Sequence, residues 1–485
     1  MKNNKLIIEG RGKTTDKPAQ QKTKAGSQDP VFARYGDPFI VSPSGKVKLN
    51  DRAVAVKCAT LNRVRYDTVT KHFERYNLAR GLWVPLHEVE VLKILDDLLQ
   101  VLAEQFDQQE FLPNVNAAKL AAVAKMLKPH DLKFQSQAMG GLVHAANGVI
   151  SLLGQKPELL THDPKYLFRH SSEIQFNPKA ACPKFLKFLE SVLGKADIAL
   201  AKKYFGSMFL GANTCHGIMV IRGTPGGGKS TLVTIVEKVL GEHLVAYLRT
   251  LHLGGRFETS AFLGKRLLVG KDVPGDALSV SVARMLKSLS GNDLMQAEIK
   301  FAPDKQALRG DFHVIIVSNN QLRIALDGDE DAWRRRLLVV DFINPKPQKP
   351  IPNLAEKLYL QEASGILNWL IEGAAMFAAE MKEHGHLQLT EAQSARIDTL
   401  LENSDNIPAF VNRCLAPNKG SDVTSEELLL GYYRVCKSEN WTPVSSHEFQ
   451  SRVPELLAQL FQTTRRNDIT RNGRAVRGFK NVTLK

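Results

Sequence analysis

Hydrophobic positions change their spacing along the chain, and each change predicts a different kind of structure. Between residues 176 and 395, short apolar runs typical of buried strands alternate with stretches of helical periodicity, the rhythm of a parallel sheet between helices. Residues 30–175 are mixed, and their clearest helix is expected from His87 to about Phe106. Residues 396–485 predict two helices followed by two β-like segments. The sequence therefore indicates an α/β chain of several domains.

One apolar run, from Gly217 to Ile221, is followed by a complete phosphate-binding loop and then by a helix-like stretch, residues 231–240. This is the strand, loop and helix order that the motif requires. Its glycines let backbone N–H groups close around phosphate oxygens, while Lys229 is expected to reach the β- and γ-phosphates and Ser230 to bind Mg²⁺. The predicted ATP-binding residues are Gly223, Thr224, Pro225, Gly226, Gly227, Gly228, Lys229, Ser230 and Thr231.

Two more predicted strands end in polar side chains. Residues 265–270 lead to Asp272, a carboxylate expected to hold Mg²⁺ or to polarise the attacking water, with Asp276 as the alternative acid. Residues 312–317 lead to Asn319, an amide that would sense the γ-phosphate or, alternatively, would only open a turn. Ligands bind beyond the carboxyl ends of strands in open α/β sheets, so both side chains are predicted to join Lys229 in a catalytic site.

Three consecutive arginines, Arg334, Arg335 and Arg336, precede the apolar run of residues 337–342. Such a cluster is either a solvated corner or the source of an arginine that stabilises transition-state charge at the γ-phosphate of a neighbouring subunit. Arg336 is the candidate for this catalytic role, and the two arginines before it are the alternatives.

Composition and charge narrow the function further. The chain has 485 residues, 43% of them hydrophobic and 24% charged, which is ordinary for a globular protein. No apolar run approaches the roughly 18 residues of a membrane span, so a soluble, cytoplasmic protein is expected. The net charge of +15 is concentrated at the ends, with +4 on residues 1–29 and +6 on residues 465–485. Basic ends favour contact with nucleic-acid phosphates. For the N-terminal segment, predicted to be a disordered tail, a solubilising surface is an equally good explanation.

The C-terminal region predicts a helix, a second helix and a basic hairpin, which together indicate a winged helix. Thr424 and Ser445 begin sequences typical of helix caps, and Asn472-Gly473 is a hairpin turn signal. Pro454 is expected to kink or shorten the second helix. A protein-docking module is the alternative, but the charge favours DNA. The candidate DNA-binding residues here are Arg465, Arg466, Arg471, Arg474 and Arg477.

The order of these motifs resembles that of superfamily 3 helicases of the AAA+ class, the motors of small DNA viruses, poxviruses, phages and mobile islands. Residues 286–301 resemble an additional motif of that family, which leads into a pore hairpin. The resemblance implies that Lys300, Phe301 and Lys305 contact a single DNA strand at the hairpin tip. It also implies a homo-hexamer with ATP between neighbouring subunits.

The resemblance extends beyond the motor. Residues 75–85 are similar to the collar domain of poxvirus-type and phage-satellite primase-helicases, and residues 362–369 are similar to their lid. No acidic or Cys/His cluster typical of a joined primase is found near the N-terminus. The expected domains are a basic tail (1–29), a mostly helical collar and oligomerisation domain (30–175), an AAA+ ATPase with a helical lid (176–395) and a winged helix (396–485).

The resemblance implies an ATP-dependent DNA helicase with 3′→5′ movement, the replication initiator or replicative helicase of a virus, phage or mobile element. It would act in a bacterial host cell or at a viral replication site, with ATP and Mg²⁺ as cofactors. Single-stranded DNA and double-stranded origin DNA are the expected partners, and a separate primase or polymerase is a further candidate. The alternatives are an ATP-switched DNA-binding or loading factor and a viral RNA-directed motor of the same superfamily.

Overall fold

The computed structural model describes residues 29–67, 71–128, 140–154, 156–275, 278–300, 305–319, 322–326, 329–343, 351–439 and 441–485. The predicted tail, apart from Asp29, lies outside these residues. The described residues form two compact units, one of residues 29–78 and 83–128 and one of residues 79–82 and 140–485. The predicted boundary at residue 176 falls inside the second unit.

The first unit combines helices with small antiparallel sheets around one apolar core. The helix predicted from His87 is confirmed as α3, and its apolar face is buried. His87 caps it, and the side chain of Glu90 bonds back to the backbone of His87. The elements are α1 (Pro30–Tyr35), β1 (Phe39–Val41), β2 (Val47–Leu49), α2 (Asp51–Asn62), β3 (Val64–Asp67), β4 (His72–Asn77), β5 (Leu82–Leu86), α3 (Glu88–Gln105), η1 (Gln109–Asn114) and α4 (Ala117–Leu127).

The second unit is built on a five-stranded sheet in which every neighbouring pair of strands is parallel. Its order is β10-β11-β14-β9-β15, so the strand before the phosphate-binding loop lies inside the sheet. The predicted parallel sheet between helices is confirmed. The strands are β9 (Ile218–Gly223), β10 (Val245–Tyr247), β11 (Leu267–Gly270), β14 (His313–Ser318) and β15 (Leu337–Phe342).

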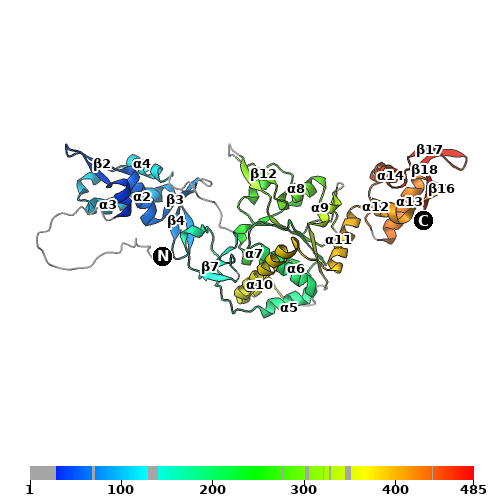
Figure 1. Cartoon of the computed structure of the whole chain (residues 1–485), viewed down its shortest axis with the longest axis horizontal. Coiled ribbons are helices and arrows are strands. Elements are labelled where there is room, and N and C mark those ends of the chain that lie inside the picture. The colour runs from blue at the N-terminus through cyan, green and yellow to red at the C-terminus, as the bar shows by residue number, and fades with distance from the viewer. Residues whose placement is uncertain are drawn as a thin grey trace. The chain divides into compact units, whose positions relative to one another are not determined.

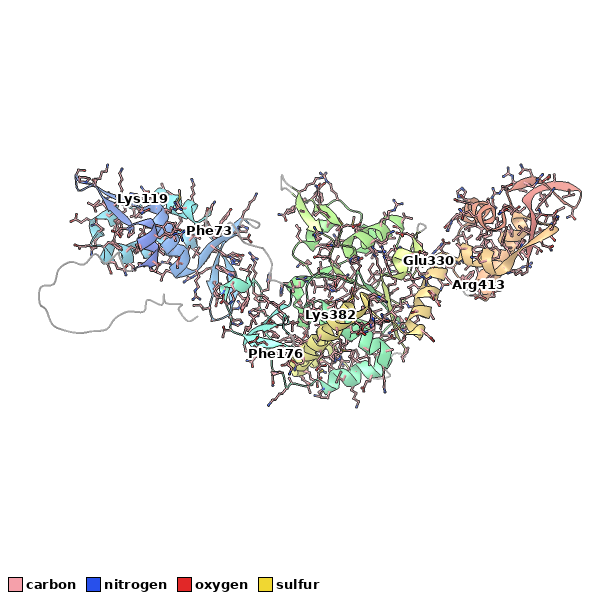
Figure 2. All side chains as sticks on the ribbon, in the orientation of Figure 1. Phe73, Lys119, Phe176, Glu330, Lys382 and Arg413 are labelled. Atoms are coloured by element: carbon pink, nitrogen blue, oxygen red, sulfur yellow. The ribbon has the colours of Figure 1, made fainter. Side chains whose placement is uncertain are left out.

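Both faces of this sheet are apolar, because successive side chains of each strand point to opposite sides. Met219 and Ile221 of β9 join one core, while Ile218 and Val220 join the other. Figure 1 shows helices on both sides of the sheet, and Figure 2 shows side chains filling the space between. The first core contains α5 (Pro183–Val192), α6 (Lys195–Ser207), α7 (Lys229–Leu240) and α10 (Leu354–His384); the second contains α8 (Val280–Ser290), α9 (Glu330–Arg334) and α11 (Glu391–Ser404).

The segment likened to a lid begins at a kink in α10. Glu362 has a non-helical backbone there, with φ of −132°, and its side chain is buried. Its carboxylate accepts hydrogen bonds from the backbone N–H groups of Lys184 (3.0 Å) and Phe185 (2.9 Å) at the start of α5. Glu362 therefore supplies the N-terminal cap that Cys182, with no capping side-chain bond, does not give α5.

Smaller elements complete this unit. A three-stranded antiparallel sheet precedes the main sheet and shares its first core through Val143 and Ile150. An antiparallel hairpin, β12 and β13, lies between α8 and β14 in the sequence, where the family resemblance implied one. The bounds are β6 (Leu142–Ala145), β7 (Gly148–Ser151), β8 (Glu158–Leu160), η3 (Pro164–Tyr166), η4 (Glu242–Leu244), η5 (Thr250–His252), η6 (Glu258–Phe262), β12 (Leu294–Ala297) and β13 (Gln306–Arg309).

Residues 406–485, here called the C-terminal domain, have a core of their own. Three of the described helices share this core with an antiparallel sheet of order β16-β18-β17. The capping box at Thr424 is confirmed, and both turn residues of the hairpin, Asn472 and Gly473, have positive φ. The elements are α12 (Asn406–Cys414), β16 (Leu415–Thr424), α13 (Ser425–Ser438), α14 (Ser446–Phe461), β17 (Arg466–Arg471) and β18 (Arg474–Leu484).

Pro454 was expected to kink or shorten its helix. The helix is not shortened, because α14 continues through Pro454 to Phe461. Proline has no N–H to donate to the carbonyl four residues earlier, which belongs to Gln450. The guanidinium of Arg465 donates to that carbonyl oxygen instead. A side chain from beyond the helix therefore replaces the hydrogen bond that proline removes.

Among the described residues, no helix combines the length and apolar character needed to cross a membrane.

Helices α6 and α10 approach so closely that glycine is required on both. A Cβ on Gly206 would lie 2.3 Å from the backbone nitrogen of Ala374, and one on Gly373 would lie 2.0 Å from the carbonyl oxygen of Lys202. Gly373→Ala is expected to push the helices apart and to lower the free energy of unfolding by about 1–3 kcal/mol, measured by denaturant titration. The control Gly154→Ala, whose nearest atom would be 3.7 Å away, should change it by less than about 0.5 kcal/mol. Equal stability of the two variants would contradict the close approach.

Candidate nucleotide-binding site

The phosphate-binding loop joins β9, inside the sheet, to the first turn of α7. Its backbone needs glycine at three positions, because φ is 145° at Gly223, 78° at Gly226 and 98° at Gly228. A Cβ on Gly223 would also lie 2.7 Å from the carbonyl oxygen of Phe342 on β15. Gly228 is the N-cap of α7 and offers no capping side chain, so the N–H groups of the first turn remain available to an anion.

Lys229 is held inside this loop. Lys229 is only 4% exposed. Its ammonium group donates hydrogen bonds to the carbonyl oxygens of Gly223 (2.7 Å) and Thr224 (2.8 Å). Burial lowers the pKa of Lys229, and the negative charge of Asp272 acts in the opposite direction. Ser230, the next residue, is exposed. The loop thus presents one constrained ammonium group and one accessible hydroxyl.

The predicted acid and amide meet at the same edge of the sheet. The side-chain N–H of Asn319 donates to Oδ1 of Asp272 over 3.2 Å. The two strand ends are also tied by Val273, whose N–H donates to the carbonyl of Val317 (2.9 Å) and whose carbonyl accepts from the hydroxyl of Ser318 (2.8 Å). Because β14 lies between β9 and β11, Asn319 sits between the strand of the loop and the strand of the acid.

The structure therefore brings Lys229, Asp272 and Asn319 to one edge, while their catalytic roles remain predictions. Asp276, the alternative acid, lies outside the described residues.

An ion pair beside Asp272 was not predicted from the sequence. Nζ of Lys271 lies 2.8 Å from Oε2 of Glu237, a residue of α7 that is 6% exposed. Asp272 follows with a left-handed backbone, φ 51°, a conformation that non-glycine residues adopt rarely. The pair anchors the turn carrying Asp272 to the helix that begins with Lys229. A glutamate on the buried side of a helix was the available signal, since such a carboxylate needs a partner.

The arginine cluster lies beside the amino end of β15, across the sheet from the loop. Arg336, the predicted catalytic arginine, is 8% exposed; its guanidinium donates to the carbonyl of Ala332 (2.8 Å), and burial lowers its pKa. Arg334 is paired with Glu330 and Asp398. Arg335 is exposed, and no described group pairs with its side chain. The structure does not bring Arg336 to Lys229 of the same chain.

The predicted DNA-binding residues of the β12–β13 hairpin are Lys300, Phe301 and Lys305. Glu298 binds two cations, with Oε1 2.8 Å from Nζ of Lys305 and Oε2 2.5 Å from Nε of Arg256. Lys300 is exposed, and Phe301 lies outside the described residues. Lys305 is therefore committed to an ion pair within the chain, one that links the hairpin to the loop before η6.

Three of the five predicted DNA-binding arginines of the C-terminal domain serve contacts inside it. Arg471 binds Asp422 (2.6 Å) and Glu427 (2.8 Å), and Arg466 makes two 2.9 Å bonds to Asp468. Arg465 donates to the Gln450 carbonyl. Sequence charge alone does not reveal these pairings, because the partners of Arg471 lie on other elements. Arg474 and Arg477 are exposed, and no described group pairs with their side chains.

Two family models match parts of the chain. The model described as "D5 N terminal like" matches residues 55–194, and the "Family of unknown function (DUF5906)" matches residues 221–336. Both describe domains of phage and viral D5-like primase-helicases. The second match spans the chain from the strand before the phosphate-binding loop to Arg336. No curated protein matches the chain.

Three solved structures of the NrS-1 C-terminal region resemble the chain distantly. "The A form apo structure of NrS-1 C terminal region-CTR" has a TM-score of 0.43 at 12% identity, covering 86% of this chain and 96% of that one. The corresponding "CTR(305-718)" structure has a TM-score of 0.46 at 11% identity, with coverage of 86% and 96%. "The apo structure of NrS-1 C terminal region (305-718)" has a TM-score of 0.45 at 11% identity, with coverage of 88% and 98%.

The ion pairs of Arg471 predict a loss of stability in Arg471→Ala that depends on pH. The Arg471 guanidinium lowers the pKa of Glu427 from 4.5 to about 2, so this contribution to stability is complete above pH 4.5 and disappears as the pH falls toward 2. Scanning calorimetry should show Arg471→Ala melting below the wild type at pH 7, with a smaller difference at pH 3.

Arg474→Ala is the control for this experiment, since its side chain has no described partner. It should melt with the wild type at both pH values. A difference between wild type and Arg471→Ala that is the same at pH 7 and pH 3 would contradict a stabilising role of the carboxylate.

Proposed function

We propose that this chain is an ATP-dependent DNA helicase of superfamily 3, of the AAA+ class, that serves in the replication of a phage, virus or mobile element. The observation that carries the proposal is the meeting of Lys229, Asp272 and Asn319 at one edge of a parallel sheet, with the amide bonded to the acid. Two segments of the chain match domains of D5-like primase-helicases, and these matches support the same assignment.

ATP and Mg²⁺ fit the residues present at this edge. The uncapped N-terminus of α7 and the glycine backbone of the loop suit phosphate oxygens. Lys229 would exchange its two carbonyl partners for phosphate oxygens. The hydroxyl of Ser230 and the carboxylate of Asp272 are hard oxygen donors of the kind that Mg²⁺ prefers. When bound, Mg²⁺ neutralises charge on the β- and γ-phosphates.

Asn319 and the Lys271–Glu237 pair have orienting roles in this proposal. The amide holds one carboxylate oxygen of Asp272, which leaves the other oxygen for the ion or for the attacking water. The ion pair keeps the turn of Asp272 at a fixed position relative to the first turn of α7. Groups oriented before the reaction need no rearrangement during it, which is the main source of electrostatic catalysis.

We assign the arginine that acts on a neighbouring subunit to Arg335 rather than Arg336. The buried guanidinium of Arg336 has an acceptor in its own chain, while Arg335 projects from the surface beside it. The cluster lies at the opposite edge of the sheet from the loop, so an arginine at the nucleotide must come from another copy. A closed ring supplies this contact at every site, and the family resemblance favours a hexamer.

DNA would contact two further regions. The β12–β13 hairpin presents Lys300 and, by the family resemblance, Phe301 to a single strand in the ring, with 3′→5′ movement. Lys305 would exchange its partner Glu298 for a phosphate of that strand. The C-terminal domain would act as a winged helix, with Arg474 and Arg477 as the two predicted arginines that have no described partner.

Lys229→Ala tests the function. It should lower ATP hydrolysis and unwinding of forked DNA at least about 100-fold, because the γ-phosphate loses its ammonium contact. Binding of a duplex by the C-terminal domain should change less than about twofold, since the substitution is remote from it. ATP hydrolysis without strand separation in the wild type would instead support the ATP-switched loading factor. Stimulation by RNA rather than DNA would support the RNA-directed motor.

Mixing two inactive variants tests the role of Arg335. Arg335→Ala should hydrolyse ATP about 10³-fold more slowly while still binding it, because the transition-state charge is no longer compensated. In a ring that contains both Arg335→Ala and Lys229→Ala subunits, some sites combine an intact Lys229 with an intact Arg335 from the neighbour. Mixed assemblies should therefore regain part of the wild-type ATPase rate.

Two outcomes decide this test. Arg334→Ala, which removes a neighbouring arginine with partners in its own chain, should retain turnover. No recovery in mixed rings, with both variants shown to assemble, would mean that Arg335 does not act between subunits.

A further inference from the structure

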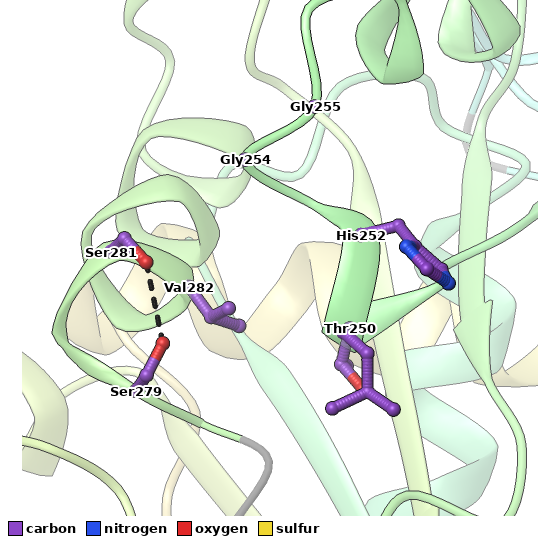
Figure 3. A pocket seen from close by; sticks show the side chains of 8 residues that line it. Thr250, His252, Gly254, Gly255, Ser279, Ser281 and Val282 are labelled. Atoms are coloured by element: carbon purple, nitrogen blue, oxygen red, sulfur yellow. Dashed lines mark hydrogen bonds between the residues drawn. The ribbon is translucent and has the colours of Figure 1, made fainter.

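A cavity of about 320 Å³ lies apart from the phosphate-binding loop, between the turn after β10 and the first turn of α8 (Figure 3). Strand β10 is at the sheet edge and is separated from β9 by β11 and β14. Three strand spacings amount to roughly 14 Å, so the cavity shares the carboxyl edge of the sheet but not the nucleotide site. Its lining is Thr250, Leu251, His252, Gly254, Gly255, Ser279, Ser281 and Val282.

The first turn of α8 gives this cavity a positive character. Ser279 is the N-cap, but its side chain makes no capping bond to the helix backbone. Its hydroxyl lies 3.3 Å from the hydroxyl of Ser281 instead, as the dashed line in Figure 3 marks. The N–H groups of the first turn thus lack a side-chain acceptor, and a helix N-terminus carries about half a positive charge. None of the described lining residues carries a carboxylate.

Thr250 is an independent sign of a ligand. The residue is 5% exposed and lines the cavity, and no described group hydrogen bonds to its hydroxyl. Because no described group uses this hydroxyl, it can bond to a molecule in the cavity. The wall opposite the serines therefore offers a further donor.

The rest of the lining suits a nucleotide unit better than a bare anion. Leu251 is 73% exposed although it is a large apolar residue. Gly254 has open space where a Cβ would be, which allows close approach to the backbone. The cavity also adjoins the segment that Arg256 links to Glu298 after β12. Single strands bind by phosphate contacts combined with flat apolar surfaces for the bases.

We propose that this cavity binds one backbone phosphate of a single nucleic-acid strand, with its base or sugar against Leu251. The inference rests on the proposed helicase function and adds a contact outside the hairpin and the C-terminal domain. The serine hydroxyls, the first-turn N–H groups of α8 and the Thr250 hydroxyl donate to the phosphate oxygens. Apart from His252, none of the described lining residues has a basic side chain, so the helix N-terminus supplies most of the attraction.

The Ser279→Asp substitution should weaken phosphate binding at the cavity without destabilising the fold. Aspartate is as good an N-cap as serine and is favourable at a helix N-terminus, so α8 should keep its stability. Its negative charge should repel a phosphate. Measured by fluorescence anisotropy with a labelled oligo-dT, the affinity of the full chain should fall about tenfold. The slope of log affinity against log salt should become shallower by about 0.7, the value for one lost phosphate contact on a single strand.

Two other variants sharpen the test. Asn116→Asp adds the same charge at another N-cap, that of α4, and should bind the strand like the wild type. Thr250→Val keeps the shape and removes a hydroxyl without a described partner. It should leave the melting temperature unchanged and weaken oligo-dT binding about threefold, whereas a purely structural hydroxyl would not affect binding.

The outcomes distinguish failure of this site from failure of the helicase assignment. If wild-type chain binds oligo-dT but Ser279→Asp and Asn116→Asp bind it equally well, the site is wrong and the helicase proposal stands. If wild type binds no single strand, both are wrong. If inorganic phosphate raises the melting temperature of wild type but not of Ser279→Asp, and both bind oligo-dT alike, the cavity holds a free phosphate and the assignment to a strand is overturned. ATP hydrolysis without DNA should be the same in all these variants.

Discussion

The two-sided burial of the parallel sheet is the constraint on which the rest of the second unit depends. Each of its strands carries apolar side chains on both faces, so helices must cover both. Polar residues are then tolerated only where strands end. Since the strands run parallel, their carboxyl ends lie together, and the loop, the acid and the amide reach one edge from distant parts of the sequence.

Local patterns were enough to predict this edge. The strand, loop and helix around Lys229, and the runs that lead to Asp272 and Asn319, are each read from a few adjacent residues, and the buried strands confirm them. The partners of single charges were not predictable in this way. Lys271 pairs with Glu237 and Arg471 with Asp422, and each pairing depends on how elements distant in sequence pack. The same limit applies to the arginine cluster, where only burial distinguishes Arg336 from Arg335.

Charge counted along the sequence overstates the charge available to a ligand. The last 21 residues have a net charge of +6, yet two of their arginines, Arg466 and Arg471, form ion pairs with carboxylates of the same domain. Of the five predicted DNA-binding arginines, Arg474 and Arg477, near the hairpin turn, are exposed and have no described partner. A basic segment can therefore have both structural and binding arginines, and only the positions of nearby carboxylates separate the two.

The contact between Arg465 and the Gln450 carbonyl joins two positions that local sequence rules treat as unrelated. Pro454 has no N–H to donate to the Gln450 carbonyl, and the side chain of Arg465 donates to that carbonyl instead. Replacement of Pro454 by a residue with an N–H would restore the helical bond and release the arginine, while loss of the arginine would leave the carbonyl to water. Selection should act on the two positions jointly, so they are expected to covary among related sequences.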